Sequence, residues 1–191
     1  MDSSDSIKRV TDVATLKAMT HPLRMRLLGL LRSRGPATAT TLAGEVGESV
    51  ASVSYHLRQL ARYEFVQEAP EHARDGRERW WRASHRFTSW SAVDFLATPE
   101  QRAAEVALRR QAIDVYEQEL REFLDSEPVW GTDWIDAADT SDYVLELTPD
   151  QTRALVGELH TVIARYLDVA PVDGDVARVR TILHLFPRER P

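Results

Sequence analysis

The sequence predicts a mainly α-helical fold with a small β content, of the α+β class. Nearly half of the 191 residues lie in stretches that place apolar side chains at the three- and four-residue spacing of amphipathic helices. Two short runs, 65–69 and 79–83, have the composition of strands and flank an Asp-Gly pair, which is typical of a hairpin turn. The hydrophobic content of 43% and the lack of cysteine indicate a core that forms without disulfides.

Two helices are expected after a polar N-terminus. Residues 1–11 carry few apolar side chains, so we expect this segment to be flexible. Residues 12–19 predict a short helix that places its apolar side chains inward. Pro22 suits the first turn of a helix and opens the second one, which Gly35-Pro36 ends.

Residues 38–63 predict two further helices joined by a tight turn. The first, 38–47, stops at Gly47, and Ser49 is a natural N-cap for the second, 50–63. Two short helices joined in this way are a helix-turn-helix unit, and the hairpin that follows makes it a winged helix. Apolar residues fill the inward positions of the second helix: Val53, Leu57 and Leu60.

The second helix of this unit is the one expected to enter the major groove of DNA. Its N-terminal half is small and polar, which lets a helix approach the base edges. Hydroxyls of helix 38–47 can meet a phosphate, and arginines of the hairpin can hold phosphates or enter a minor groove. His56 is as well suited to packing against the preceding helix as to a phosphate contact. The candidate DNA-contacting residues are Thr38, Thr40, Ser49, Ala51, Ser52, Ser54, Tyr55, His56, Arg58, Arg74, Arg77 and Arg79.

A long helix is expected after a short aromatic segment that follows the hairpin. The sequence Thr98-Pro99-Glu100-Gln101 combines an N-cap, a first-turn proline and a glutamine whose side chain can accept from the backbone N–H of the N-cap residue. The helix should therefore run from 99 to about 125. Together with helix 12–19, it is the expected dimer interface. Apolar residues recur along it at positions suited to a partner helix: Val106, Ile113, Tyr116, Leu120 and Phe123. Arg109 interrupts this series.

The last part of the chain predicts a small strand-helix-strand unit. Apolar and polar residues alternate in 142–148 and 178–186, and Thr148-Pro149 opens a helix between them. Two strands joined by such a helix are expected to pair in parallel with a right-handed crossover. Five aromatic residues are a candidate ligand pocket, although they suit a core or a dimer interface as well: Tyr116, Phe123, Trp130, Trp134 and Tyr143.

Charge divides the chain into two halves. The formal net charge is −6, but residues 1–90 carry +4 and residues 91–191 carry −10. A basic half suits a polyanionic partner such as DNA. The expected organisation is a flexible segment 1–11, a DNA-binding domain 12–87, a helical dimerisation or linker segment 88–127, and a C-terminal α/β unit 128–191 for dimerisation, effector or partner binding.

The N-terminal part resembles the ArsR-type winged-helix transcriptional regulators, over roughly residues 12–85. A weaker resemblance, to an actinobacterial-type subgroup with an added C-terminal domain, rests on 145–149 and 183–187. The resemblance implies a homodimer that binds inverted-repeat operator DNA, often as a repressor. Four stretches carry the main resemblance in order: THPLRMRLL at 20–28, TLA at 41–43, SVSYHLRQL at 52–60 and RERWW at 77–81.

Metal sensing is not expected of this chain. Members of that family that sense metals use paired cysteines, or Asp and His on a C-terminal helix, whereas this chain has no cysteine and helix 99–125 has no histidine. His160 and His184 would need a third ligand to hold a metal. We therefore expect no cofactor and no metal, and we expect any effector to be a small organic molecule.

The sequence thus predicts a sequence-specific DNA-binding regulator, and the alternative is a winged-helix module that binds another protein. The exposed face 51–58 is polar and lightly basic, which suits a DNA groove better than an apolar interface. An enzyme with its site in 126–191 is not expected, because no phosphate-binding loop, HExxH motif or nucleophile elbow is present. With no apolar run near 20 residues and no signal peptide, we expect a cytoplasmic protein without a membrane partner.

Overall fold

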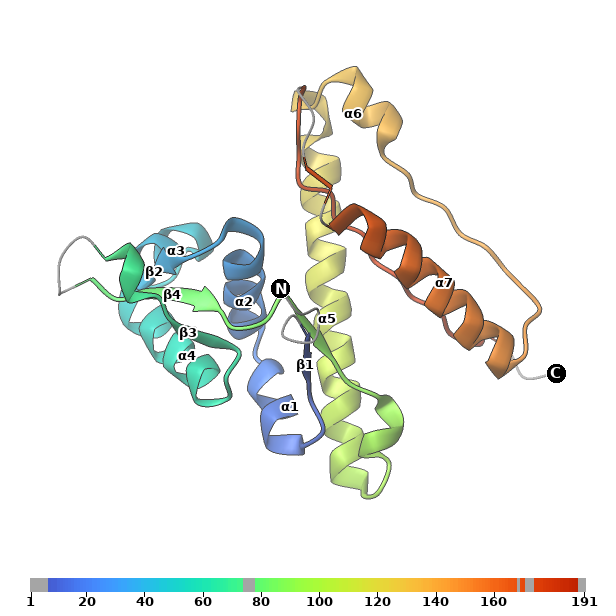
Figure 1. Cartoon of the computed structure of the whole chain (residues 1–191), viewed down its shortest axis with the longest axis horizontal. Coiled ribbons are helices and arrows are strands. Elements are labelled where there is room, and N and C mark those ends of the chain that lie inside the picture. The colour runs from blue at the N-terminus through green and yellow to red at the C-terminus, as the bar shows by residue number, and fades with distance from the viewer. Residues whose placement is uncertain (1–6, 74–77, 168, 171–173, 189–191) are drawn as a thin grey trace. The chain divides into compact units, whose positions relative to one another are not determined.

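The computed structural model describes residues 7–73, 78–167, 169–170 and 174–188. The chain forms two compact units, 1–125 and 126–191 (Figure 1). Helices dominate both units, and the short strands lie in the first, which confirms the predicted α+β class. No helix among the described residues is long and apolar enough to cross a membrane.

The first unit starts with a strand, where the sequence predicted a flexible segment. β1 (Ile7–Arg9) pairs in parallel with β5 (Phe87–Ser89), and the next residue, Val10, donates from its backbone N to Ser89 O at 2.8 Å. Val10 is only 2% exposed and belongs to the core. The prediction of flexibility is therefore wrong for 7–10, because a distant strand supplies the backbone partner and the core takes up Val10; residues 1–6 lie outside the described part of the chain.

The first two predicted helices are confirmed, and a side chain caps the N-terminus of each. In α1 (Val13–Met19), the carboxylate of Asp12 accepts a hydrogen bond from Thr15 N at 2.8 Å. In α2 (Pro22–Arg34), Nδ1 of His21 accepts from Leu23 N at 3.2 Å. Each cap satisfies a backbone N–H that the helix itself leaves without a partner.

The predicted helix-turn-helix is present. α3 (Ala39–Val46) ends at Gly47, whose φ of 71° is left-handed, and its N–H bonds to Ala43 O. α4 (Val50–Arg62) follows at once, so the turn between the helices is tight. The three predicted inward side chains of α4 are fully buried in the core that they share with α1, α2 and the sheet: Val53, Leu57 and Leu60.

The wing is a three-stranded antiparallel sheet. The predicted hairpin strands are confirmed as β3 (Val66–Glu68) and β4 (Trp80–Ala83), which pair antiparallel. β2 (Ala37–Thr38) pairs with the other edge of β4 and was not predicted, because two residues show no alternation. A short 3-10 helix, η2 (Pro70–His72), follows β3. The Asp-Gly pair predicted to form the turn, 75–76, lies outside the described residues.

The long helix is α5 (Pro99–Ser126), preceded by the 3-10 helix η3 (Ala92–Phe95). Its predicted capping box is present: Gln101 N donates to Thr98 Oγ1, and Thr98 N donates to Gln101 Oε1, both at 3.2 Å. The side that packs on the rest of the first unit carries Ala104, Glu105, Leu108 and Ala112. Among the predicted partner-helix positions, Ile113 and Leu120 are exposed, whereas Val106, Tyr116 and Phe123 are half-buried.

The second unit contains the predicted helix but not the predicted strands. It consists of the 3-10 helix η4 (Glu127–Val129), α6 (Thr132–Ala137) and α7 (Pro149–Leu167), with Thr148 capping α7. Residues 142–148 and 178–186 are extended but form no strand, so the prediction of a parallel strand pair is wrong for the single chain. The physical reason is that no described side chain of this unit is buried, so no core holds the two segments together.

Candidate nucleic-acid interface

The N-terminal half of α4 presents a polar face opposite its buried one. Ala51 and Arg58 are exposed, Tyr55 is 53% exposed, and Ser52 and Ser54 are half-buried. No acidic residue lies within α4. The side chains available to a ligand on this face are therefore small, hydroxylated or basic, which are the types that contact base edges and phosphates.

Two of the predicted contact residues serve as helix caps. Thr38 Oγ1 accepts from Thr41 N at 3.1 Å, and Ser49 Oγ accepts from Ser52 N at 3.1 Å. A hydroxyl that accepts a backbone hydrogen bond still has a proton to donate, so Ser49 keeps the capacity to bind a phosphate oxygen. The Thr38 hydroxyl also shares a hydrogen bond of 3.0 Å with Thr41 Oγ1, in which either oxygen can be the donor. Thr40, the third hydroxyl predicted from helix 38–47, is exposed on α3.

His56 is buried and does not belong to the exposed face. It is 9% exposed, and its ring lies 4.3 Å from the ring of His21 and 5.1 Å from that of Tyr55, measured between centroids. Burial lowers the pKa of His56, and the neighbouring His21 and Arg24 lower it further. We therefore correct the predicted DNA contact: the packing of α4 on the start of α2 takes His56 away from the surface.

Arg24 joins the same cluster, which the sequence did not reveal. Burial lowers the pKa of Arg24, and its charge interacts with Tyr55 and Tyr63. Among the described residues, buried Nε of Arg24 and Nδ1 of His56 have no hydrogen-bond partner. No local pattern predicts this cluster, because it arises only when α2 packs on α4.

The wing arginines are only partly described. Arg74 and Arg77 lie outside the described residues. Arg79 is exposed, and its Nε lies 3.2 Å from a carboxylate oxygen of Glu68 on the paired strand. Arg82, which was not among the predicted contacts, similarly pairs with Glu71 at 3.0 Å. Each ion pair partly neutralises the positive charge that the wing offers to a phosphate.

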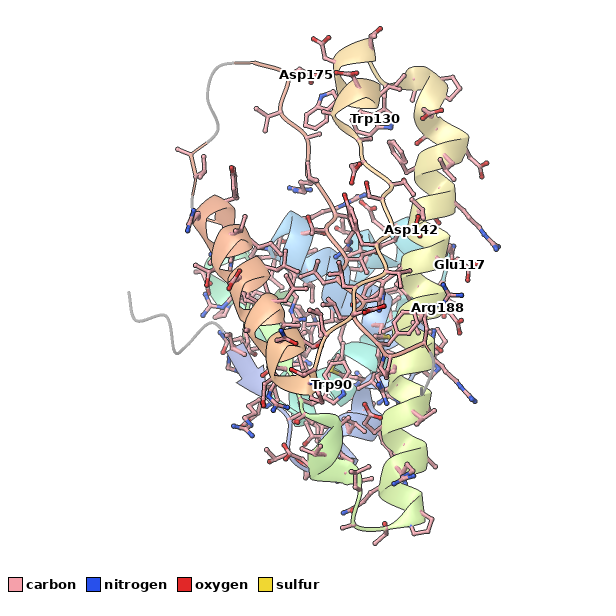
Figure 2. The ribbon with its side chains drawn as sticks, turned by 90° about the vertical axis from the view of Figure 1, so that its right-hand side faces the viewer. Trp90, Glu117, Trp130, Asp142, Asp175 and Arg188 are labelled. Atoms are coloured by element: carbon pink, nitrogen blue, oxygen red, sulfur yellow. The ribbon has the colours of Figure 1, made fainter. Side chains whose placement is uncertain are left out.

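The five aromatic residues of the candidate ligand pocket are divided between the units. Tyr116 and Phe123 are half-buried on α5, in the first unit. In the second unit, the Trp130 and Trp134 rings lie 6.2 Å apart, and Trp134 Nε1 donates to Asp175 at 2.8 Å; Figure 2 shows Trp130 and Asp175 at the same end of this unit. Tyr143 is exposed.

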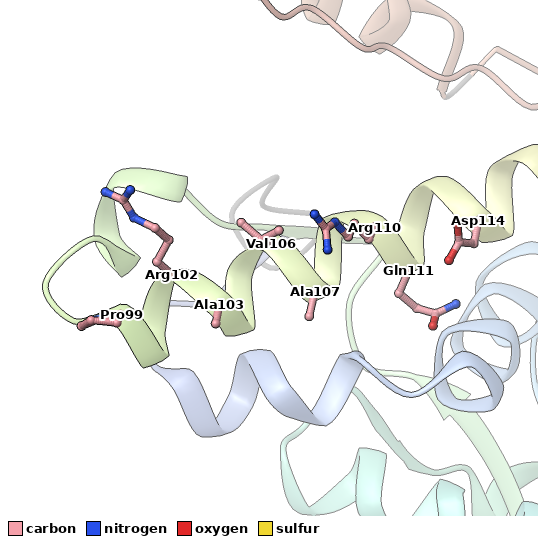
Figure 3. Close-up of a pocket in the computed structure, with 8 residues that line it drawn as sticks. All are labelled: Pro99, Arg102, Ala103, Val106, Ala107, Arg110, Gln111 and Asp114. Atoms are coloured by element: carbon pink, nitrogen blue, oxygen red, sulfur yellow. The ribbon is translucent and has the colours of Figure 1, made fainter.

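A cavity of about 590 Å³ lies instead along one face of α5 (Figure 3). None of the five aromatic residues lines this cavity, so the prediction of an aromatic pocket has no counterpart there. No three His, Asp or Glu side chains come together as a metal site within the part of the chain that the structure describes. The cavity is lined by Pro99, Arg102, Ala103, Val106, Ala107, Arg110, Gln111 and Asp114.

These features define the first unit as a winged helix-turn-helix domain. A left-handed glycine turn joins two capped helices, the second helix buries one face and exposes a polar one, and a small antiparallel sheet follows. Domains of this class place their second helix in the major groove of DNA.

Comparison with known proteins agrees with this class. Residues 19–68, from the end of α1 to β3, match the family model described as a helix-turn-helix domain. No curated protein sequence matches the chain. Two structures of a double mutant of ZitR from Lactococcus lactis are similar to this chain at 15% identity. The match to the apo form covers 77% of this chain and 83% of the ZitR chain, with a TM-score of 0.33. The match to the second structure covers 76% of this chain and 75% of the ZitR chain, with a TM-score of 0.32. TM-scores this low support no inference about this chain.

Proposed function

We propose that this chain is a sequence-specific DNA-binding transcriptional regulator, a homodimeric repressor of the ArsR type that uses no thiolate metal site. The observation that carries the proposal is the polar, acid-free face of α4, which a buried apolar face holds in place. The buried apolar face fixes α4 in the core of its own domain, and the polar face remains available to enter a DNA groove.

In the proposed complex, Ser52, Ser54 and Tyr55 read base edges, and Arg58 holds a phosphate or a guanine. Ala51 can meet a thymine methyl, and the hydroxyls of Thr38, Thr40 and Ser49 hold the backbone. The wing, through Arg74, Arg77 and Arg79, holds the flanking phosphates. A two-fold dimer of such domains requires two half-sites about 10–10.5 base pairs apart, or a multiple of this spacing.

The proposed dimer interface consists of α1 and α5. Lys17 on α1 and Glu100 at the start of α5 form an ion pair at 2.6 Å, so the two helices are linked within one copy. Val106, Ile113 and Leu120 recur at seven-residue spacing on α5, and the last two are exposed in the single chain. This spacing is typical of a helix that packs against a second helix. An organic effector is proposed to bind at the aromatic residues of α5 or of the second unit.

Fluorescence anisotropy tests the proposal, with labelled DNA from upstream of the chain's own gene, a scrambled fragment, and two salt concentrations. We expect tighter binding to the native fragment and weaker binding at high salt, because released counterions drive the phosphate contacts. Arg58→Ala should weaken binding. Ser52→Ala or Ser54→Ala should change sequence preference by about 1 kcal/mol or more at each base that the removed hydroxyl recognises.

Arg165→Ala is the matched control, since it removes the same charge from an exposed position on α7. Equal losses of affinity for Arg58→Ala and Arg165→Ala would show that Arg58 does not contact DNA. Unchanged sequence preference in Ser52→Ala and Ser54→Ala would show that α4 is not the reading helix. If neither DNA fragment binds even at low salt, two alternatives replace the proposal as stated: a form that needs a ligand to bind DNA, or a winged helix that binds a protein.

A further inference from the structure

The second unit of the single chain lacks a core of its own. Throughout its described residues no side chain is buried, although α7 alone is 19 residues long. Large apolar side chains of its extended segments are exposed instead: Tyr143 is 81%, Val179 73% and Phe186 71% exposed. Soluble monomers rarely leave such an extent of apolar surface uncovered, so this unit needs a partner to bury it.

The two extended segments of this unit have the side-chain pattern of strands. In 142–148, Tyr143, Leu145 and Leu147 occupy alternate positions, and in 178–186 apolar residues occur on both faces. Neither segment is a strand in the structure, and Figure 1 shows the first as an extended trace that leads into α7. Extended, apolar segments outside a sheet are ready templates for pairing with another chain.

The segments are also complementary in charge. The charged residues in 126–150 are all acidic, and those in 176–188 are all basic. When Val144 is placed opposite Ile182, both the parallel and the antiparallel registers bring acidic side chains opposite basic ones, and the other face is largely apolar on both strands. Opposite charges across a strand pair stabilise it. The acidic residues in this register are Asp142 and Glu146, and the basic ones are Arg180 and His184.

We infer that residues 142–148 of one copy pair with residues 178–186 of a second copy of this chain, so that two exchanged strand pairs complete the C-terminal units of a dimer. The inference rests on the proposed homodimer, in which α5 leads directly into the second unit of each copy. A two-fold axis makes the exchange reciprocal, so that every dimer contains the strand pair twice. The single chain forms no such pair internally, although it contains both segments.

The absence of cysteine from the chain permits a direct test. Val144→Cys and Ile182→Cys are made in separate full-length chains with different affinity tags, co-expressed, purified on both tags in turn, and oxidised. Val93→Cys replaces Ile182→Cys in the control pair, because Val93 is exposed on η3 in the first unit. A double variant with both cysteines in one chain reports pairing within a copy. Analytical ultracentrifugation of the unmodified protein and the DNA-binding assay are run in parallel.

We expect the 144/182 pair to give a disulfide-linked dimer on a non-reducing gel, at a yield several times that of the 144/93 pair. A disulfide that forms only within the double variant would overturn the inference, because the strands would then pair within one copy. An unmodified dimer with no 144/182 cross-link would overturn it as well and leave the proposed function intact. A monomer that binds DNA would overturn both the exchange and the proposed homodimer, whereas a cross-linked dimer without DNA binding would refute only the proposed function.

Discussion

Arg109→Ala should destabilise the first unit by more than an exposed ion pair is worth, because it removes the charge partner of a buried carboxylate. Glu105 on α5 is only 3% exposed. Its carboxylate accepts hydrogen bonds from Trp90 Nε1 at 3.1 Å and from Arg109 Nη2 at 3.0 Å, and Arg109 Nε lies 2.8 Å from it. After the substitution, only the Trp90 hydrogen bond remains.

The structure sets the expected size of this effect. Removing one partner of a fully buried ion pair costs about 3–5 kcal/mol. Because the Arg109 side chain is 56% exposed, water can approach the carboxylate from that side, and we expect about 2 kcal/mol. Glu105→Gln combined with Arg109→Ala removes the buried charge and keeps an acceptor for Trp90, so the double variant should lose only about 1 kcal/mol.

Urea unfolding followed by far-ultraviolet circular dichroism measures these free energies, at one fixed protein concentration because a dimer unfolds in a concentration-dependent way. Arg121→Ala is the control: Arg121 pairs with the exposed Glu117 on the same helix, and its removal should cost less than about 1 kcal/mol. The reasoning fails if Arg109→Ala and Arg121→Ala lower the free energy of unfolding equally, or if the double variant is less stable than Arg109→Ala alone.

Three further outcomes follow from the structure. Leu57→Ala should lower the free energy of unfolding by about 2–5 kcal/mol, since Leu57 is fully buried, whereas Val93→Ala on the surface should change urea unfolding little. Thr98→Ala should cost about 1 kcal/mol, because it removes the N-cap of α5; Thr98→Ser, which keeps the hydroxyl, is its control. The pKa values of His21 and His56 lie below the ordinary 6.5, chiefly because of burial. Between the folded and the unfolded pKa values, the unfolded chain therefore binds more protons than the folded chain. Stability should therefore fall as the pH drops below about 6.5 in thermal unfolding, and a flat profile would contradict the buried pair.

Local chemistry accounts for the elements that the sequence predicted correctly. His21-Pro22 starts α2, Gly47 ends α3, and Thr98 with Gln101 caps α5, each through contacts within a few residues. Such signals need no knowledge of the rest of the fold. The buried face of α4 was predictable for a similar reason, because helical periodicity alone separates its two sides.

The features that were missed depend on contacts between distant parts of the chain. β1 exists only because β5 pairs with it, and the burial of His56 requires the start of α2 to pack on α4. In 142–148 and 178–186 the alternation was recognised, but alternation indicates only that a segment suits a sheet. It does not show which strand lies beside it, and the single chain does not supply one.

The distribution of charge reconciles an acidic chain with the proposed DNA contact. The net charge of −6 belongs to the whole chain, whereas α4 has Arg58 and Arg62 and no acid. In the wing, Glu68 and Glu71 pair with arginines, so few free cations remain to hold phosphates among the described residues of that sheet. Each phosphate neutralised contributes about −0.9 to the slope of log affinity against log salt, so this slope measures how many phosphates the arginines of the wing and of α4 hold in the proposed complex. We propose that sequence preference in such a complex comes mainly from α4, through Ser52, Ser54 and Tyr55.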